Sequence, residues 1–343
     1  MTVEVLVALS GGVDSSVAAA LLVEAGHRVV GVTMKLWGGP SDSGCCSVSD
    51  VDDARRVAQQ LGIDHHVFNF GDDFDRHVVD PYVAGYAAGL TPNPCIECNR
   101  HLKFDRLLSR AAQLGFDRIA TGHHARVVAG PSGLRIGRGA DATKDQSYVL
   151  YMLGQAQLRR LELPIGGLTK DEVRARAAAL GLRTAGKPDS QDVCFIRADR
   201  GGRRAFLGER IPLRAGRIVD ADGHQLGSVP AIELVTLGQR KGLGLGGSDD
   251  RRYVIDVDRP GGTVTVGSFQ ELLSDRVVLR NPVWASEPPE GPVTVQTSAH
   301  GRVRAGRVDG EVISWERPEP RVAPGQAVVL YDGDEVLGGG IAA

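Results

Sequence analysis

The sequence predicts an α/β fold: a parallel sheet covered by helices, then a small β-rich region and an antiparallel β-barrel. Three observations support this prediction. In the first half, short apolar or β-branched runs alternate with helical patterns. After about residue 195 the helical period fades and glycines become frequent. Beyond about residue 281, strand-like runs are separated by Asp-Gly pairs, which favour β-hairpin turns.

The parallel sheet is predicted from four runs with the length and composition of buried strands. Gly62 and Gly115 follow two of the helical segments between these runs, where a glycine typically ends a helix. Thr169 and Glu172 form a capping box in front of a third segment. Strands are expected at 3–9, 29–34, 65–70 and 118–121, and helices at 16–25, 50–61, 103–114 and 169–180. In such a sheet, ligands bind beyond the carboxyl ends of the strands.

The second half is predicted to be β-rich throughout. Alternating runs favour strands in a central region, and a second set beyond a Pro- and Glu-rich stretch favours a small barrel. Hairpin turns are expected at Asp309-Gly310 and Asp332-Gly333. Strands are expected at 253–257, 263–266, 293–297, 302–308, 311–315, 327–331 and 336–337. We therefore divide the chain into three domains, at 1–200, 201–275 and 276–343.

Length and composition restrict the class of protein. At 343 residues, two or three domains are expected. The 42% hydrophobic and 24% charged content fit a globular protein that buries a sizeable core. No apolar run reaches the ~20 residues of a membrane span, and the N-terminus has no signal-peptide pattern. We expect a cytoplasmic protein without membrane contact. The net charge of −2 indicates that any nucleic-acid-binding surface is local.

The five cysteines are too few and too unevenly spaced for a disulfide scaffold in a chain of this length. Redox, metal or nucleophilic chemistry is the expected use. Cys98 follows two prolines and precedes a predicted helix, whose dipole favours a thiolate. Cys194 lies almost a hundred residues downstream, which does not prevent contact across a sheet. The other cysteines are Cys45, Cys46 and Cys95.

The segment 10–16, of sequence SGGVDSS, lies between a predicted strand and a predicted helix. Two glycines allow a ligand close to the backbone, serine hydroxyls add donors, and the helix start offers N–H groups to an anion. No lysine follows the glycines, so this is not a Walker A loop. The segment resembles the PP-loop of the ATP pyrophosphatases, which cleave ATP between the α and β phosphates. The structural alternative is an ordinary Gly-Ser turn.

Six segments, in order along nearly the whole chain, resemble bacterial tRNA-specific 2-thiouridylases. They are residues 10–16, 91–99, 122–126, 144–148, 188–195 and the pair 324–326 with 338–340. The resemblance implies a Rossmann-like N-terminal domain with a PP-loop. It also implies 2-thiolation of the wobble uridine of tRNA, in which ATP adenylates the uridine O2 and sulfur then displaces AMP.

The resemblance also implies roles for particular residues. Asp14 would lie on the Mg²⁺ side of ATP. Cys194 would receive a persulfide sulfur from a cysteine desulfurase or a relay protein. Cys98 would be the nucleophile, and a Cys98–Cys194 disulfide would remain after each turnover. The implied ATP-binding residues are Ala8, Leu9, Ser10, Gly11, Gly12, Val13, Asp14, Ser15, Met34 and Gly122.

Contacts with tRNA are implied in the same way. The target base would lie against Asn93, Pro94 and Cys95. The further implied contacts are His123, Lys144, Asp145, Gln146, Ser298, Ala299 and Gln326. Without the resemblance, these side chains would be ordinary surface or turn polarity. The arginine-rich stretch 197–217 predicts either a phosphate-binding patch or a solvated linker.

The sequence departs from the family pattern in three places. Cys95 replaces a common Asp, so Cys95, Cys98 and Cys194 could instead hold a [4Fe–4S] cluster that carries the sulfur. A zinc site with Cys45 and Cys46 is disfavoured, because adjacent cysteines chelate poorly. His124 replaces a common Tyr. Ser298 and Ala299 supply less charge than the basic strand of many relatives.

Two other function classes remain open from the sequence. A PP-loop amidotransferase or ligase acting on a small molecule would share the loop but would not need Cys98 or Cys194. A non-catalytic tRNA-binding protein would need only the barrel and the arginine-rich stretch. The sequence leaves the oligomeric state open, with a monomer expected. It does not identify the sulfur donor or the tRNAs that are modified.

Overall fold

A computed structural model describes residues 2–36, 48–189, 193–196, 199, 201–245 and 251–343. Cys45 and Cys46 lie outside these residues. The first part of the chain forms a five-stranded sheet in the order β3-β2-β1-β4-β7, and every neighbouring pair is parallel. Its strands are β1 Glu4–Ala8, β2 Arg28–Lys35, β3 Asp64–Asn69, β4 Arg118–Ala120 and β7 Leu161–Glu162. The predicted parallel sheet is confirmed, and β7 adds an edge strand that was not expected.

Helices cover both faces of this sheet. Successive side chains of β1 point to opposite faces, and those on each face are apolar and need cover. Val5 and Val7 pack in one apolar cluster with Ala19 and Ala54, whereas Leu6 packs in a separate, larger cluster on the opposite face. The first face is covered by α1 Val13–Glu24 and α2 Val48–Leu61, with α8 Lys170–Ala179 beside α1. This arrangement leaves the carboxyl ends of the strands open for a site.

The second face is covered by helical segments that begin earlier than the sequence predicts. A helix was expected at 103–114, but helical structure starts at Pro94, after Asn93 caps the N–H of Cys95. Pro94 therefore begins a helix instead of extending a loop, as proline at a first helical position often does. The segments are α3 Gly71–Phe74, α4 Asp80–Ala87, α5 Pro94–Glu97 and α6 Leu107–Gln113, with π-helical stretches at Asp75–Val79 and Cys98–Arg106. Two short helices, α7 Gln155–Leu158 and α9 Gly202–Gly208, lie further along the chain.

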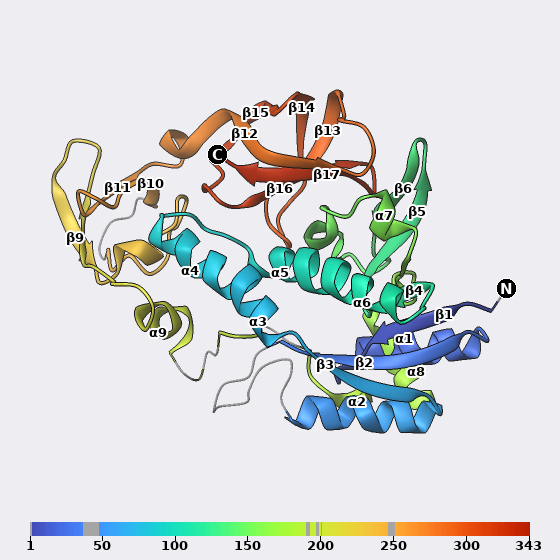
Figure 1. The fold of residues 1–343 in the computed structure, drawn as a ribbon. Helices are drawn as coiled ribbons and strands as arrows, with labels where there is room; N and C mark the ends of the chain where they lie inside the picture. Colours follow the sequence, from blue (N-terminus) through green and yellow to red (C-terminus); the bar gives the residue numbers. More distant parts are fainter. Residues whose placement is uncertain (1, 37–47, 190–192, 197–198, 200, 246–250) are drawn as a thin grey trace.

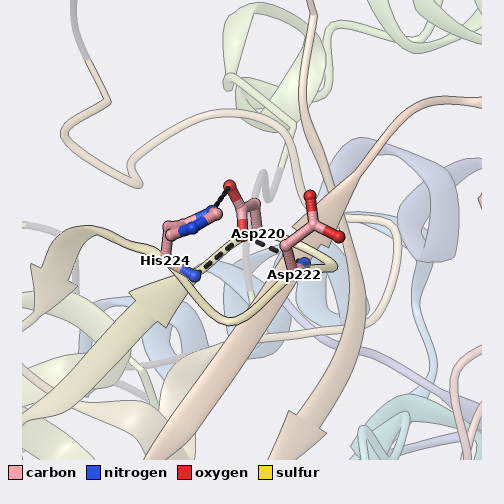
Figure 2. A group of neighbouring side chains, drawn as sticks. All are labelled: Asp220, Asp222 and His224. Carbon is pink, nitrogen blue, oxygen red and sulfur yellow. Dashed lines mark hydrogen bonds and ion pairs between the residues drawn. The ribbon is translucent and has the colours of Figure 1, made fainter.

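The central region is a four-stranded sheet in the order β10-β11-β8-β9, at the left of Figure 1. Its strands are β8 Gly216–Val219, β9 Gln225–Val229, β10 Tyr253–Asp258 and β11 Thr263–Gly267. Between β8 and β9, Asp220 accepts hydrogen bonds from the backbone N–H groups of Asp222 and His224, and its other oxygen lies 3.3 Å from His224 Nδ1 (Figure 2). These contacts account for the cluster of Asp220, Asp222 and His224 as a turn-stabilising group.

The C-terminal region is a closed antiparallel barrel, which confirms the predicted fold. Six strands follow the order β12-β15-β14-β13-β16-β17, and pairing of β12 with β17 closes the ring. They are β12 Leu273–Trp284, β13 Gly291–Gln296, β14 Arg304–Asp309, β15 Val312–Pro320, β16 Ala327–Asp332 and β17 Glu335–Ala342. Asp309 pairs with Val312 and Asp332 with Glu335, so each two-residue turn begins at the glycine, one residue later than predicted.

A hairpin from the first part of the chain joins the barrel sheet. It consists of β5 Ala125–Gly130 and β6 Gly133–Arg138, and β6 pairs with β17 at Glu335 and Gly137. In Figure 1 this green hairpin lies beside the barrel. The large apolar cluster likewise runs from the parallel sheet to Val329 and Tyr331 of the barrel. Among the described residues, no helix is long and apolar enough to cross a membrane.

Candidate active site

The predicted phosphate-binding loop lies between β1 and α1. Gly11 has a positive φ of 73°, and a side chain there would meet the carbonyl oxygen of Asp50 at 2.3 Å. Gly12 is the N-cap of α1 and supplies no side-chain acceptor. The N–H groups at 13–15 therefore lack both a side-chain cap and an acceptor within the helix. Such a helix start binds anions, so the loop fits the phosphates of ATP.

Serine hydroxyls hold the loop in shape. Ser15 Oγ accepts the N–H of Ser10 at 3.1 Å, and the two hydroxyl oxygens are 3.2 Å apart. Ser16 Oγ donates to the carbonyl of Gly12 at 2.7 Å. Ser15 and Ser16 are thus occupied inside the loop, and Ser10, although exposed, contacts Ser15 through both its N–H and its hydroxyl. This geometry goes beyond an ordinary turn, because the loop is preorganised around a helix start.

Gly122 and Met34 lie beside this loop, as the strand order requires. Gly122 follows β4, and a Cβ on it would lie 2.5 Å from the backbone nitrogen of Ser15. Only glycine permits so close an approach. Met34 is near the carboxyl end of β2, which pairs with β1. The residues predicted to bind ATP therefore gather at the ends of three adjacent strands.

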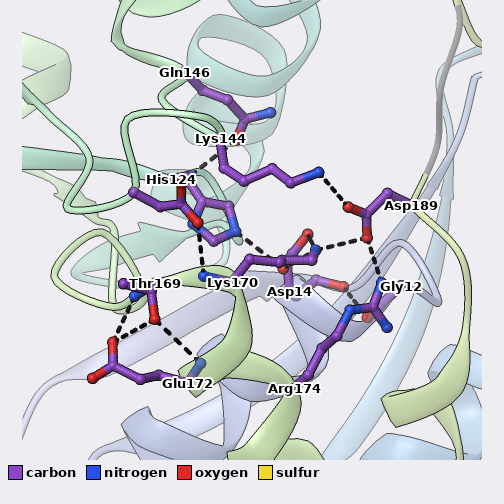
Figure 3. A network of polar contacts seen from close by, with 12 residues as sticks. Gly12, Asp14, His124, Lys144, Gln146, Thr169, Lys170, Glu172, Arg174 and Asp189 are labelled. Carbon is purple, nitrogen blue, oxygen red and sulfur yellow. Dashed lines mark hydrogen bonds and ion pairs between the residues drawn. The ribbon is translucent and has the colours of Figure 1, made fainter.

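Asp14, in the first turn of α1, is held by two cationic or polar partners (Figure 3). Lys170 Nζ lies 2.7 and 2.8 Å from its two carboxylate oxygens, and His124 Nε2 lies 3.2 Å from one of them. Burial alone would raise the pKa of the Asp14 carboxyl, but the hydrogen bonds from His124 and Lys170 outweigh it and lower the pKa. Asp14 is therefore a carboxylate at neutral pH, and its place on the Mg²⁺ side of ATP stays a prediction.

Asp189 is a second acidic centre that the sequence analysis did not single out. Its carboxylate lies 2.8 Å from Lys144 Nζ, 2.9 Å from Lys170 Nζ and 2.8 Å from Arg174 Nη2 (Figure 3). Burial opposes ionisation, but the hydrogen bonds from Lys144 and Lys170 lower the pKa of Asp189 to about 2. Lys170 is only 7% exposed and joins Asp189 to Asp14. The two acidic residues thus share one buried cation.

Lys187 forms a second connection to the loop. Its Nζ donates to the carbonyl of Gly11 at 2.9 Å and binds the carboxylates of Asp50 and Asp53 at 2.6 and 2.8 Å. The stretch that leads to Cys194 is therefore attached to the nucleotide loop at both Lys187 and Asp189. No spacing pattern in the sequence could have identified these pairs, because their partners come from separate elements.

Four residues predicted to contact tRNA lie near this network, and two of them are buried while Lys144 and Gln146 are half-buried. His123 is 7% exposed, with Nδ1 at 2.7 Å from Thr121 Oγ1. Asp145 is 6% exposed and accepts hydrogen bonds from the side chain of Arg138 and the backbone of Gly139. Lys144 binds Asp189, and Gln146 accepts the backbone N–H of His124. Their contact with tRNA stays a prediction.

Of the other predicted tRNA residues, all but Cys95 line a common cavity of about 240 Å³. Asn93 and Pro94 form one side of it, and Ser298, Ala299 and Gln326 of the barrel region form another. The lining also includes three tyrosines, one arginine and the residue that precedes Cys194: Tyr82, Tyr86, Tyr148, Arg203 and Val193. The structure therefore brings together segments that are more than two hundred residues apart in the sequence. Aromatic walls and polar amides suit a flipped base.

The described cysteines differ in burial. Cys95 is exposed, Cys98 is buried and Cys194 is intermediate. Because the helix starts at Pro94, the helix dipole favours a thiolate at Cys95 more than at Cys98, contrary to the sequence expectation. Cys98 belongs to the large apolar cluster, and Cys194 packs against that cluster. Among the described residues, these cysteines form no group that could hold a single metal ion.

Within the arginine-rich stretch, three of the described arginines contact neighbouring side chains. Arg203 lies over the ring of Tyr86 at 5.6 Å and Arg210 over that of Phe206 at 3.9 Å. Arg214 binds the carboxylate of Glu233 at 2.9 Å. Arg197 and Arg200 lie outside the described residues. These contacts tie the stretch to the protein itself, and a phosphate-binding role for it stays a prediction.

A phosphate-binding loop at the carboxyl edge of a parallel sheet, combined with a β-rich region and a closed barrel, defines a nucleotide-binding protein of the PP-loop class. Family models match all three parts. They are described as a tRNA methyl transferase HUP domain over residues 3–198, a tRNA methyl transferase PRC-barrel domain over 204–268 and an aminomethyltransferase beta-barrel domain over 274–342.

Relatives that match nearly the full length of the chain are named for a reaction other than methyl transfer. A tRNA-specific 2-thiouridylase MnmA from Chloroflexus aurantiacus is 48% identical over 98% of this chain and 97% of its own length. Proteins of the same name from Thermobifida fusca and Rhodococcus jostii are 48% and 49% identical, over 98% of this chain and 95% and 96% of theirs. The chain belongs to the tRNA-specific 2-thiouridylase family.

Solved structures are more distant. A U34-tRNA thiolase NcsA from Methanococcus maripaludis with its [4Fe-4S] cluster is 20% identical, covers 61% of this chain and 64% of its own, and has a TM-score of 0.37. A 4-thiouridine synthetase–RNA complex with bound ATP is 19% identical, covers 56% and 45% of the two chains, and has a TM-score of 0.40. Neither likeness is close enough to assign a cluster or an ATP site to this chain.

Proposed function

We propose that this protein uses ATP to convert a uridine of tRNA, at the wobble position, into 2-thiouridine. Family membership supports the substrate and the product. The observation that carries the mechanism is the loop 10–16, an uncapped helix start beside the carboxylate of Asp14. That loop would bind the phosphates of ATP while the uridine O2 attacks the α phosphorus. Pyrophosphate leaves, and the base is adenylated.

Sulfur transfer would follow at the cysteines. The terminal sulfur of a Cys194 persulfide attacks C2 of the adenylated base, and AMP leaves. The thiolate of Cys98 then attacks the Cys194 sulfur, which releases 2-thiouridine and forms a Cys98–Cys194 disulfide. Alternatively, Cys98 attacks first and releases the sulfur as sulfide, which then displaces AMP. Either order ends in a disulfide, so an external thiol reductant must supply two electrons per turnover.

The cofactors and partners of this proposal are Mg²⁺ with ATP, tRNA, and a cysteine desulfurase or relay protein as sulfur donor, in the cytoplasm. When bound, Mg²⁺ would neutralise charge on the phosphates, and Asp14 would hold it. A [4Fe–4S] carrier on Cys95, Cys98 and Cys194 is the competing route. Iron and sulfide analysis after anaerobic purification distinguishes the two, since the persulfide route requires no stoichiometric iron.

The proposal is tested with the purified protein, unmodified tRNA, ATP, Mg²⁺ and a persulfide donor. The wild type should release pyrophosphate only with tRNA present and should form 2-thiouridine, detected by mercury-gel retardation of the tRNA. Cys194→Ser should abolish 2-thiouridine while pyrophosphate release continues, and Asp14→Asn should abolish both. Full 2-thiouridine formation by Cys194→Ser would refute the persulfide route. Pyrophosphate release without tRNA on a small-molecule acceptor would favour a ligase.

A further inference from the structure

Cys194 lies between two attachment points that belong to different parts of the site. Upstream, Asp189 binds the cations beside the nucleotide loop. Downstream, the ring of Phe195 packs edge-on against Tyr82, with centroids 5.5 Å apart, and lies 5.1 Å from Phe206. Tyr82 also lines the 240 Å³ cavity together with Asn93. The persulfide candidate is therefore connected on one side to the nucleotide loop and on the other to the cavity.

The upstream attachment restricts where Cys194 can lie. Cys194 is the fifth residue after Asp189, and five fully extended residue steps span at most about 18 Å. An attacking sulfur must approach C2 of the adenylated base closely, and misplacement by about 1 Å can slow such a reaction about 100-fold. A fixed point at Asp189 therefore reduces the volume that the sulfur must search.

Arg174 strengthens the same attachment. Its Nη2 binds Asp189 at 2.8 Å, while its Nη1 donates to the carbonyls of Ala185 and Lys187 at 2.8 and 3.0 Å. One side chain of α8 thus holds both the backbone and the carboxylate of this stretch. Because Lys170 on the same helix binds Asp14, the helix connects the adenylation site to the stretch that leads to Cys194.

We propose that Asp189 is a positioning residue for the sulfur-transfer step, which holds the stretch bearing Cys194 beside the nucleotide site through Lys144, Lys170 and Arg174. This inference rests on the proposed function. It assigns Asp189 no contact with ATP or tRNA. Lys170 also binds both carboxylate oxygens of Asp14, so the adenylation site should keep that pair when the charge of Asp189 is removed.

The test separates the two half-reactions in Asp189→Asn, which keeps the shape and removes the charge. Single-turnover 2-thiouridine formation from persulfide-loaded protein should fall about 10-fold or more. Pyrophosphate release with tRNA should stay within about threefold of the wild type. Asp189→Glu, which restores the charge, should recover part of the sulfur transfer. Asp171→Asn, an exposed carboxylate in the first turn of α8, is the matched control and should change neither rate.

The rate at which an alkylating reagent modifies Cys194 is a second measure of how firmly this cysteine is held. In the reduced protein, alkylation at Cys194 should be faster in Asp189→Asn than in the wild type, while exposed Cys95 reacts at an unchanged rate. Should Asp189→Asn fail to fold, Arg174→Gln loosens the same stretch. Its matched control is Arg176→Gln. Arg176 lies on α8, as Arg174 does, and its half-exposed side chain binds Glu24 of α1.

Equal losses of pyrophosphate release and of 2-thiouridine in Asp189→Asn would overturn the inference, because Asp189 would then act on adenylation. Unchanged 2-thiouridine formation would also overturn it. Failure of the proposed function looks different: the wild type itself would form no 2-thiouridine from a persulfide donor, whatever residue stands at 189.

Discussion

Lys170 is the residue on which the polar site is centred. A lysine with 7% exposure must be paired, because an isolated buried ammonium is strongly disfavoured. Its partners Asp14 and Asp189 both accept hydrogen bonds from it. The loop 10–16 has no lysine of its own, so the fold delivers a cation from α8 instead. That cation lies beside the helix start where phosphates would bind.

The depressed pKa of Asp189 predicts a pH dependence of stability. Its folded-state pKa of about 2 is below the ordinary value of 3.8, so its ion pairs stabilise the fold above about pH 4. This stabilisation is lost as the pH falls from about 4 to about 2. The thermal midpoint of Asp189→Asn should therefore lie below that of the wild type at pH 6. The two midpoints should approach each other as the pH falls below about 4, as differential scanning fluorimetry from pH 6 to pH 2 would show. A constant difference across this range would contradict the assignment.

At the residue scale, the sequence predicted those positions whose place follows from a general rule. Ser10, Gly11, Met34 and Gly122 follow from the rule that ligands bind at the carboxyl ends of parallel strands. Asp189 and Lys170 could not be predicted in this way. Their pairing depends on where α8 packs, which no local pattern specifies.

The first turn of α8 both stabilises that helix and supplies Lys170 to the nucleotide site. Thr169 and Glu172 form a complete capping box, and Lys170 is the first residue of the helix. Thr169→Ala should therefore destabilise the protein by about 1 kcal/mol. It should also slow tRNA-dependent pyrophosphate release, because fraying of the first turn displaces Lys170 from Asp14. Urea unfolding and the pyrophosphate assay measure the two effects.

A matched control exists in the region before β12. Ser268 and Glu271 make the same reciprocal pair of hydrogen bonds at a short helical turn. Ser268→Ala should cost comparable stability without changing pyrophosphate release. If both variants slowed the reaction equally, the effect would come from general destabilisation and the link through Lys170 would be wrong.

At the element scale, boundaries were less predictable than element types. The parallel strands and the barrel were predicted from periodicity, and the structure confirms them. The helix expected to begin at residue 103 begins at Pro94, because Asn93 supplies the cap and proline fits the first helical position. This pair was interpreted as part of an extended loop. The consequence is that Cys95, and not Cys98, lies in the first helical turn.

At the scale of the whole molecule, the first part of the chain and the barrel share one interior. The hairpin of β5 and β6 extends the barrel sheet, and the large apolar cluster includes Tyr151 and Tyr331 from the two regions. Local sequence patterns could not predict this pairing, since a short hairpin contains no information about which distant strand it joins. The cavity with Asn93 and Gln326 exists because of this docking.

An arginine that forms a largely buried ion pair also contacts the barrel where the hairpin docks. Arg138, at the end of β6, binds Asp145 at 2.8 Å and the side chain of Gln296 at 3.0 Å, and its guanidinium lies 3.9 Å from the ring centre of Tyr331. Gln296 in turn donates to the carbonyls of Ser298 and Ala299. One arginine therefore joins the hairpin, the barrel and the loop that lines the cavity.

Arg138→Met should consequently be among the most damaging single changes outside the catalytic residues. It leaves the 6%-exposed carboxylate of Asp145 without its cation, and loss of one partner of a buried pair costs about 3–5 kcal/mol. Urea unfolding should show this loss and should separate the barrel from the first part of the chain into two transitions. Arg307→Met, at an exposed arginine of β14, should cost less than about 0.5 kcal/mol and keep one transition. A single transition at the wild-type urea concentration in Arg138→Met would contradict this prediction. It would mean that the apolar contacts of the shared core hold the two regions together without the contacts of Arg138.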